Sequence, residues 1–164
     1  MTLRRILAAA SVVAMFAAPL AAPSPVQAAQ ICTGSPAADF LGAVSDNLTV
    51  PANAVCDLSH LRIFGNVEVQ DGGTLSGTDV EFDGNLVATN TAQITFDTSR
   101  LNGNMRTAGH VTVVITASEI NGNLDLGGDA VTLTGNTVNG RVQLSPSAPA
   151  CDGNAVNGSL TGCP

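Results

Sequence analysis

Apolar residues recur in a fixed pattern along most of this chain. Each repeat holds two apolar residues two positions apart, such as Leu86 and Ala88, then a second pair, such as Ile94 and Phe96, and a closing residue, such as Leu101. Alternation with a period of two predicts short β-strands that turn one face inward. The first strand of successive repeats is predicted at Leu48/Val50, Val67/Val69, Leu86/Ala88, Met105/Thr107, Leu124/Leu126 and Val142/Leu144. Three inward groups per repeat indicate three short faces around a narrow apolar centre.

One glycine precedes the first strand of each repeat, and its recurrence gives the period. The spacing is nineteen residues up to Gly122 and eighteen residues afterwards. A period this short is typical of a solenoid, in which each unit buries its apolar side only against its neighbours. We therefore predict an all-β, single-domain parallel β-helix, or β-solenoid, with about seven coils of 18–19 residues over residues 45–164. The corner glycines, which we expect to adopt positive φ, are Gly65, Gly84, Gly103, Gly122, Gly140 and Gly158.

The residue after the corner glycine is usually asparagine. Stacked asparagines of successive coils can hydrogen-bond to one another as a ladder along the axis. Such a ladder could line a ligand groove, but structural turn ladders are commoner in solenoids, and we interpret this one as structural. Its predicted members are Asn66, Asn85, Asn104 and Asn123, and Arg141 and Ser159 interrupt it.

A column of alternating charge supports the same register. Arg62, Glu81, Arg100 and Glu119 are spaced by one coil each. Parallel strands stack ~4.8 Å apart, so these side chains are predicted to form an ion-pair ladder on the outer surface. His110 falls over Asp129 in the same way, but the register brings no nucleophile to this pair. We therefore interpret it as a surface hydrogen bond.

The N-terminus has the pattern of a signal peptide. Arg4 and Arg5 precede an apolar run over residues 6–18, which is followed by prolines and by the small-residue site at Val26–Ala28. We predict a signal peptide over residues 1–28, an N-terminal cap segment over 29–44, with 39–44 folded over the first coil, and the repeat domain over 45–164. No later segment is apolar for long enough to cross a bilayer. The predicted location is extracellular, with the cell wall as a candidate site of association.

The charge balance excludes some partners. The whole chain has a formal net charge of −7, and without the leader four arginines remain against thirteen Asp and Glu residues, a charge of −9. Such a chain repels polyphosphates and anionic lipids, so binding to nucleic acid or to a membrane surface is disfavoured.

The four cysteines lie near the two ends of the repeat domain. An even number of cysteines in an exported chain predicts disulfides. Cys32 and Cys56 are about five coils, or ~24 Å at strand spacing, from Cys151 and Cys163, whereas bridged Cα atoms lie within ~7 Å. The predicted bridges are Cys32–Cys56 and Cys151–Cys163. No Cys-x-x-Cys motif or Cys/His cluster indicates a metal site, and no cofactor is predicted.

Three segments carry a resemblance to a known group. Val50–Leu58, the Asn-Gly-Asn motifs at 102–104 and 121–123, and Cys151–Gly158 are similar to small secreted β-solenoid proteins of the actinomycete type. The resemblance covers nearly the whole chain after the leader. It implies a secreted parallel β-helix and carries no assigned activity. A more distant similarity, to bactofilins that polymerise end to end, conflicts with the leader and the cysteine-capped ends, so we expect a monomer.

These observations favour a non-catalytic structural or surface-interaction protein with an unknown envelope or extracellular partner. The alternative is a polysaccharide-binding or polysaccharide-cleaving β-helix, but the coils are too short for groove-forming loops, and the chain has no Trp or Tyr for stacking on sugars. Ice binding, which β-solenoids perform with a flat array of outward threonines, is disfavoured by the outward column of the first strand. That column reads Thr49, Glu68, Val87, Arg106, Asp125, Gln143 and Thr161.

Overall fold

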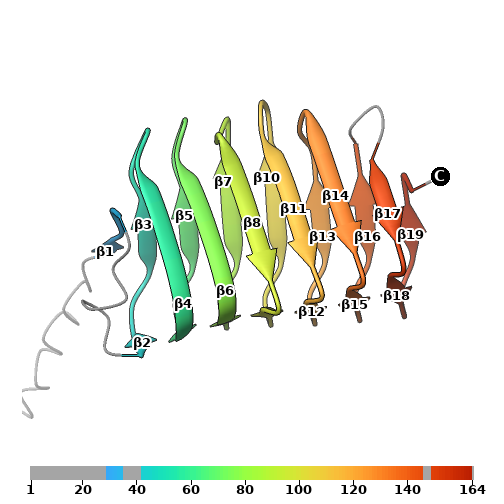
Figure 1. Cartoon of the computed structure of the whole chain (residues 1–164), viewed down its shortest axis with the longest axis horizontal. Helices are drawn as coiled ribbons and strands as arrows, with labels where there is room; N and C mark the ends of the chain where they lie inside the picture. Colours follow the sequence, from blue (N-terminus) through green and yellow to red (C-terminus); the bar gives the residue numbers. More distant parts are fainter. Residues whose placement is uncertain (1–28, 35–41, 146–148, 164) are drawn as a thin grey trace, which may run out of the picture.

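A computed structural model describes residues 29–34, 42–145 and 149–163 of the chain. Every regular element in these residues is a β-strand, and the strands stack in register along one axis (Figure 1). The described chain makes six complete turns and a partial seventh, and each turn has three faces, which we call A, B and C. The predicted all-β parallel β-solenoid is thus confirmed.

Face A is an eight-stranded parallel sheet formed by the first strand of each turn. Its strands are two to four residues long, and the six strands between the two end strands bury alternate residues, as the period of two in the sequence predicts. In spatial order the strands are β1 (Gln30–Ile31), β3 (Leu48–Val50), β5 (Val67–Val69), β7 (Leu86–Thr89), β10 (Met105–Ala108), β13 (Leu124–Leu126), β16 (Val142–Leu144) and β19 (Leu160–Thr161).

Faces B and C together form one eleven-stranded sheet, because two long strands run around the corner between them. These strands are β4 (Val55–Ile63) and β6 (Thr74–Phe82), which start on face B and end on face C. Face B continues through β8 (Gln93–Asp97), β11 (Thr112–Thr116), β14 (Ala130–Thr134) and β17 (Ala150–Asp152). Face C also holds β2 (Ala43–Val44), β9 (Arg100–Leu101), β12 (Glu119–Ile120), β15 (Thr137–Val138) and β18 (Ala155–Val156).

The core is a single apolar column enclosed by the three faces. In one turn, the three predicted inward positions are held by Leu86, Ile94 and Leu101, and all three are buried. The register follows the sequence columns across the change of period, since Val113 pairs with Ile94 on one side and with Val131 on the other. One turn has Gly77 at an inward position, opposite Phe96 of the next turn, and neighbouring side chains fill the space.

Two aromatic rings occupy the space that Gly77 leaves. The ring centroids of Phe82 and Phe96 lie 4.8 Å apart. A Cβ atom added to Gly77 would lie 3.0 Å from the ring of Phe96. The glycine therefore compensates for the volume of two phenylalanines in a core that, like other protein interiors, is close-packed.

The corner glycines differ from the prediction in their backbone conformation. None of the six has positive φ. A Cβ on Gly84 would instead overlap the carbonyl oxygen of Gly65, and the same clash between neighbouring coils recurs at each later corner glycine, while Gly65 meets Asp46. Glycine is required here because backbones of successive coils approach too closely for any side chain.

Positive φ occurs in a different column, at the corner between faces B and C. Its residues stack one above another, and only the last two are glycine, although left-handed backbone is unfavourable for most other residues. The column consists of His60 (φ 54°), Asp79 (54°), Thr98 (48°), Ala117 (49°), Gly135 (65°) and Gly153 (61°). Histidine and aspartate adopt this conformation more readily than most residues, so the bend imposed by the stack overrides local preference at Thr98 and Ala117.

Both ends of the rod carry a disulfide. Cys32 and Cys56 are bridged with Cα atoms 5.5 Å apart, and Cys151 and Cys163 with Cα atoms 5.9 Å apart. At the N-terminal end, β1 adds to face A and β2 adds to face C. The predicted signal peptide and residues 35–41 of the predicted cap lie outside the described residues. No helix in the described part of the chain is long and apolar enough to cross a membrane.

We predict that Gly103→Ala lowers the free energy of unfolding by roughly 2–3 kcal/mol, because the added methyl group forces two coil backbones apart. Gly135→Ala is the matched control, since a Cβ there meets no atom within 4 Å and Ala117 already occupies the same column. The control should lose about 1 kcal/mol through its left-handed backbone. Urea titration measures both values, and equal losses would contradict the requirement for close backbone approach.

Candidate functional site

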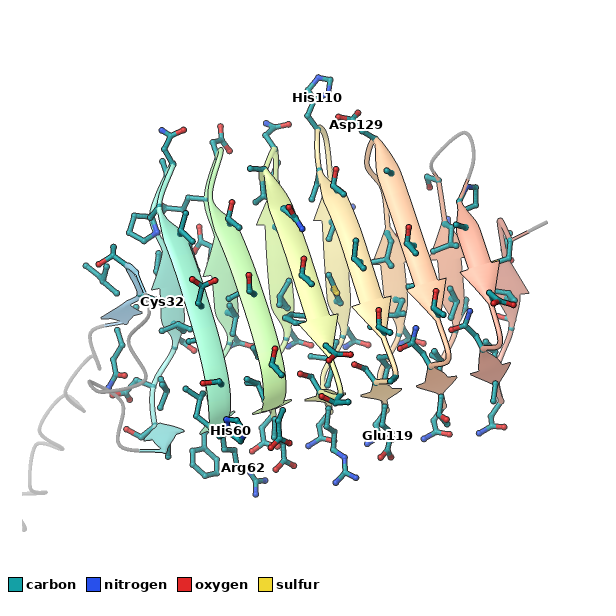
Figure 2. All side chains as sticks on the ribbon, viewed as in Figure 1. Cys32, His60, Arg62, His110, Glu119 and Asp129 are labelled. Carbon is teal, nitrogen blue, oxygen red and sulfur yellow. A yellow bond between two sulfur atoms is a disulfide. The ribbon has the colours of Figure 1, made fainter. Side chains whose placement is uncertain are left out.

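A shallow groove of about 600 Å³ follows the corner between faces B and C. All four side chains of the predicted ion-pair ladder line this groove. Figure 2 shows His60, Arg62 and Glu119 along this lower edge of the rod. Its charged lining consists of His60, Arg62, Asp79, Glu81, Arg100 and Glu119.

The charge column in this groove forms two separate clusters. Arg62 Nε lies 2.7 Å from Asp83 Oδ2 and Nη1 lies 3.5 Å from Glu81 Oε2. Arg100 Nη2 lies 2.7 Å from Glu119 Oε2. Within the described residues, Arg100 and Glu81 do not come within the 4.0 Å of an ion pair. The predicted four-residue ladder is interrupted there because Glu81 accepts a hydrogen bond from Asn102 instead, at 3.1 Å.

Asp83, which the sequence analysis did not single out, is the best-connected carboxylate of the groove edge. It accepts a hydrogen bond from Arg62 and another from Asn102 Nδ2 at 2.8 Å. The Arg62 hydrogen bond holds the pKa of the Asp83 carboxyl below its ordinary value, although desolvation opposes this shift. The same hydrogen bond raises the pKa of Arg62. Asp83 therefore stays ionised as an anchor for its neighbours and is poorly suited to act as a proton donor.

The predicted asparagine ladder lies at the corner between faces C and A. Asn104 Nδ2 donates to Asn85 Oδ1 at 3.1 Å, and the same oxygen accepts the Asn104 backbone N–H at 3.0 Å. The pattern starts at Asn47 and ends where Asn123 Oδ1 accepts the backbone N–H of Arg141. Asn66, Asn85 and Asn104 thus each bond to the coil before and the coil after, as expected of a structural ladder.

A second amide ladder runs beside the first. Asn102 Nδ2 donates to Asp83, Asn121 to Asn102 at 2.9 Å, Asn139 to Asn121 at 2.7 Å and Asn157 to Asn139 at 2.6 Å. In the sequence, the first asparagine of each Asn-Gly-Asn motif indicates this second ladder.

A third ladder lies in the interior, at the position that Leu61 and Val80 fill in the first turns. Ser99 Oγ accepts the Val80 backbone N–H at 3.2 Å, and Ser118 Oγ accepts that of Ser99 at 3.1 Å. The ladder continues through Asn136 to Asn154. Sequence analysis missed this ladder because a lone polar residue between apolar columns does not reveal which way it points.

Two histidine–aspartate pairs lie on opposite corners of the rod. His110 Nδ1 is 3.2 Å from Asp129 Oδ1, with the two side chains 88% and 64% exposed, at the upper corner in Figure 2. His60 Nε2 is 3.8 Å from Asp79 Oδ2. In the described part of the chain, neither imidazole hydrogen-bonds to a hydroxyl, and no cysteine is free.

No group of three or more His, Cys, Asp or Glu side chains in the described residues is placed to hold a metal ion. Comparison with known proteins adds no functional assignment: no family model, no curated protein and no solved structure matches the chain. The actinomycete-type resemblance therefore stays a prediction.

We predict that Asn104→Ala lowers the free energy of unfolding by about 1–2 kcal/mol, because the Asn123 backbone N–H and the Asn85 amide each lose a partner. Gln143→Ala, on the outer side of face A, removes an exposed amide outside the ladders and should change stability by less than about 0.5 kcal/mol. Urea titration of both variants measures the difference. Equal effects would show that the ladder contributes no stability.

The pKa shift of Asp83 predicts an acid-sensitive contribution to stability. A carboxylate whose pKa is lowered on folding stabilises the protein above its unfolded pKa of ~3.9 and loses this contribution as pH falls through the folded value. Asp83→Asn should therefore flatten the fall in unfolding free energy below about pH 4. Glu68→Gln removes a carboxylate that makes no ion pair among the described residues, and it controls for net charge. An acid profile unchanged by Asp83→Asn would contradict the assignment.

Proposed function

We propose that the protein is a secreted, non-catalytic β-solenoid that acts by presenting its surface at the cell envelope or in the extracellular space. The observation that carries this proposal is the internal pairing of its polar groups. Arg62, Asp83 and Asn102 bond to one another, and the amide ladders bond along the axis. Groups that are paired in this way stabilise the rod, which supports a structural role for them over a chemical one.

The construction of the rod fits an extracellular role. Two disulfides close its first and last turns. Disulfides persist in oxidising compartments and are rare in the cytosol. They also hold end coils whose open strand edges would otherwise pair with other chains. This supports the expectation of an exported chain that acts as a monomer.

A polysaccharide-directed role is the second candidate, because the groove between faces B and C offers hydrogen-bonding groups. Sugar sites usually add an aromatic platform. The exposed aromatic side chain near this groove is Phe64, which is 50% exposed, and the Arg62 guanidinium carbon lies 4.8 Å from its ring centroid. The ring is thus already covered by a cation. This favours the surface-interaction role over sugar binding in the groove.

We expect the purified protein to cleave none of a panel of acidic and neutral polysaccharides, with or without calcium, and to co-sediment with an isolated envelope or extracellular fraction. His110→Ala and Asp129→Ala test the exposed pair, and His60→Ala tests the groove. Release of reducing or unsaturated ends that disappears in one of these variants would replace the proposal with the enzyme alternative. Absence of the protein from every sedimented fraction would contradict the interaction role.

A further inference from the structure

The outer side of face B carries a grid of hydroxyl groups that was not visible in the first-strand column. It spans β6, β8, β11 and β14, which lie side by side on the face toward the viewer in Figure 1. Register places its residues in three columns along the axis. They are Thr74–Gln93–Thr112–Ala130, Ser76–Thr95–Val114–Thr132 and Thr78–Asp97–Thr116–Thr134. Eight of these twelve outward positions are serine or threonine.

The spacing of this hydroxyl grid is regular in two directions. Neighbouring positions along the axis are ~4.8 Å apart, and alternate residues along a strand are ~6.6 Å apart. Most of the hydroxyls belong to threonine, whose branched side chain has few χ1 rotamers in a strand. Sheets usually twist, but side-chain ladders can hold them flat. Three side-chain ladders run from coil to coil along the corners and in the interior, and such ladders limit twist and favour a preorganised grid.

The hydroxyls of the grid are left for solvent. Within the described residues, the hydrogen bond from Gln93 Nε2 to Thr95 Oγ1, at 2.8 Å, is the one that engages a grid hydroxyl. No arginine lies on the grid, and Asp97 is its one charged side chain. A face with threonine methyl groups and free hydroxyls at a fixed repeat can hold water in a matching repeat.

We propose that the hydroxyl grid of face B binds the surface of ice. The axial spacing of the grid is close to the shorter repeat of oxygen atoms on the prism faces of hexagonal ice. Each water contact is weak, but a rigid array gains many contacts at once without ordering its side chains. Water held between the threonine columns thus joins the protein to the growing lattice.

Ice fits this grid better than a crystalline polysaccharide does. Sugar faces are bound by stacking on aromatic rings, and no grid position is aromatic. The outward residues of face A, on the same rod, differ from those of face B. Its outward column contains Glu68, Arg106 and Asp125, whose charges break any repeat of hydroxyls. The earlier argument against ice binding therefore holds for face A and does not extend to face B.

This inference rests on the proposed role of the surface, but it can fail separately. Envelope binding without ice binding would leave the proposed function intact and remove only the role of face B. Catalytic turnover would contradict the proposed function. The ice measurements alone would then decide the ice-binding proposal.

The test compares one substitution on two faces. Val114→Lys places a long cation in the middle of the grid, and Val87→Lys places the same side chain on the outer side of face A. Thermal hysteresis, ice-crystal shape and the fraction of protein taken up by slowly growing ice are measured for each, with melting curves to establish folding. The parent protein and Val87→Lys should shape the crystals and enter the ice, and Val114→Lys should lose both effects while remaining folded.

A second variant tests the proposal through a gain of ice binding, so that its result does not depend on the loss of activity in a damaged protein. Asp97→Thr removes the charge from the grid and should increase both hysteresis and uptake into ice. Exclusion of the parent protein from ice, or equal losses in the two lysine variants, would overturn the proposal. Sedimentation with cellulose or chitin that is lost in Val114→Lys, without entry into ice, would assign the grid to a polysaccharide and overturn it as well.

Discussion

Close stacking of backbones at the glycine corner is the constraint on which the rest of the rod depends. At Gly84 and each later corner glycine, the site of a Cβ atom is occupied by the carbonyl of the glycine one coil earlier. A side chain there would separate adjacent turns and break the parallel hydrogen bonds on both sides. Backbone hydrogen bonds set the spacing of the strands, and the glycine column lets the chain keep that spacing at this corner, so that one register continues through faces A, B and C.

Polar ladders maintain this stacking away from the corner. Amides that bond along the axis satisfy their own hydrogen-bonding groups and those of the neighbouring backbone. The interior ladder through Ser99 and Ser118 does the same within the core, where an unpaired N–H would be costly. A small solenoid with a narrow centre thus obtains part of its order from hydrogen bonds parallel to its axis, in addition to apolar burial.

The same regularity supports the proposal that the protein acts through its surface. Short coils leave little room for loops that could enclose a substrate, and charged groups at the corners pair with one another. What such a rod can offer is repetition over a flat area. Faces A and B differ in this respect, because one carries mixed charges and the other carries hydroxyl columns. A surface that binds through side chains repeated from coil to coil favours a partner whose own surface repeats at a similar distance.

The sequence by itself determined the fold class, the register and the cysteine pairs. Its period is a local property, and every inward position, such as Leu86 or Ile94, recurs in each turn with the same character. Only the tertiary structure decided how the corners are made, because φ and the distance between coil backbones follow from stacking. It placed left-handed backbone at Thr98 and Ala117, where residue type does not indicate it. It also showed that the corner glycines are required because a side chain there would clash with the next coil. It also decided which outward columns form one flat face, because neighbours such as Thr95 and Val114 are a full coil apart in the chain and meet only across the sheet.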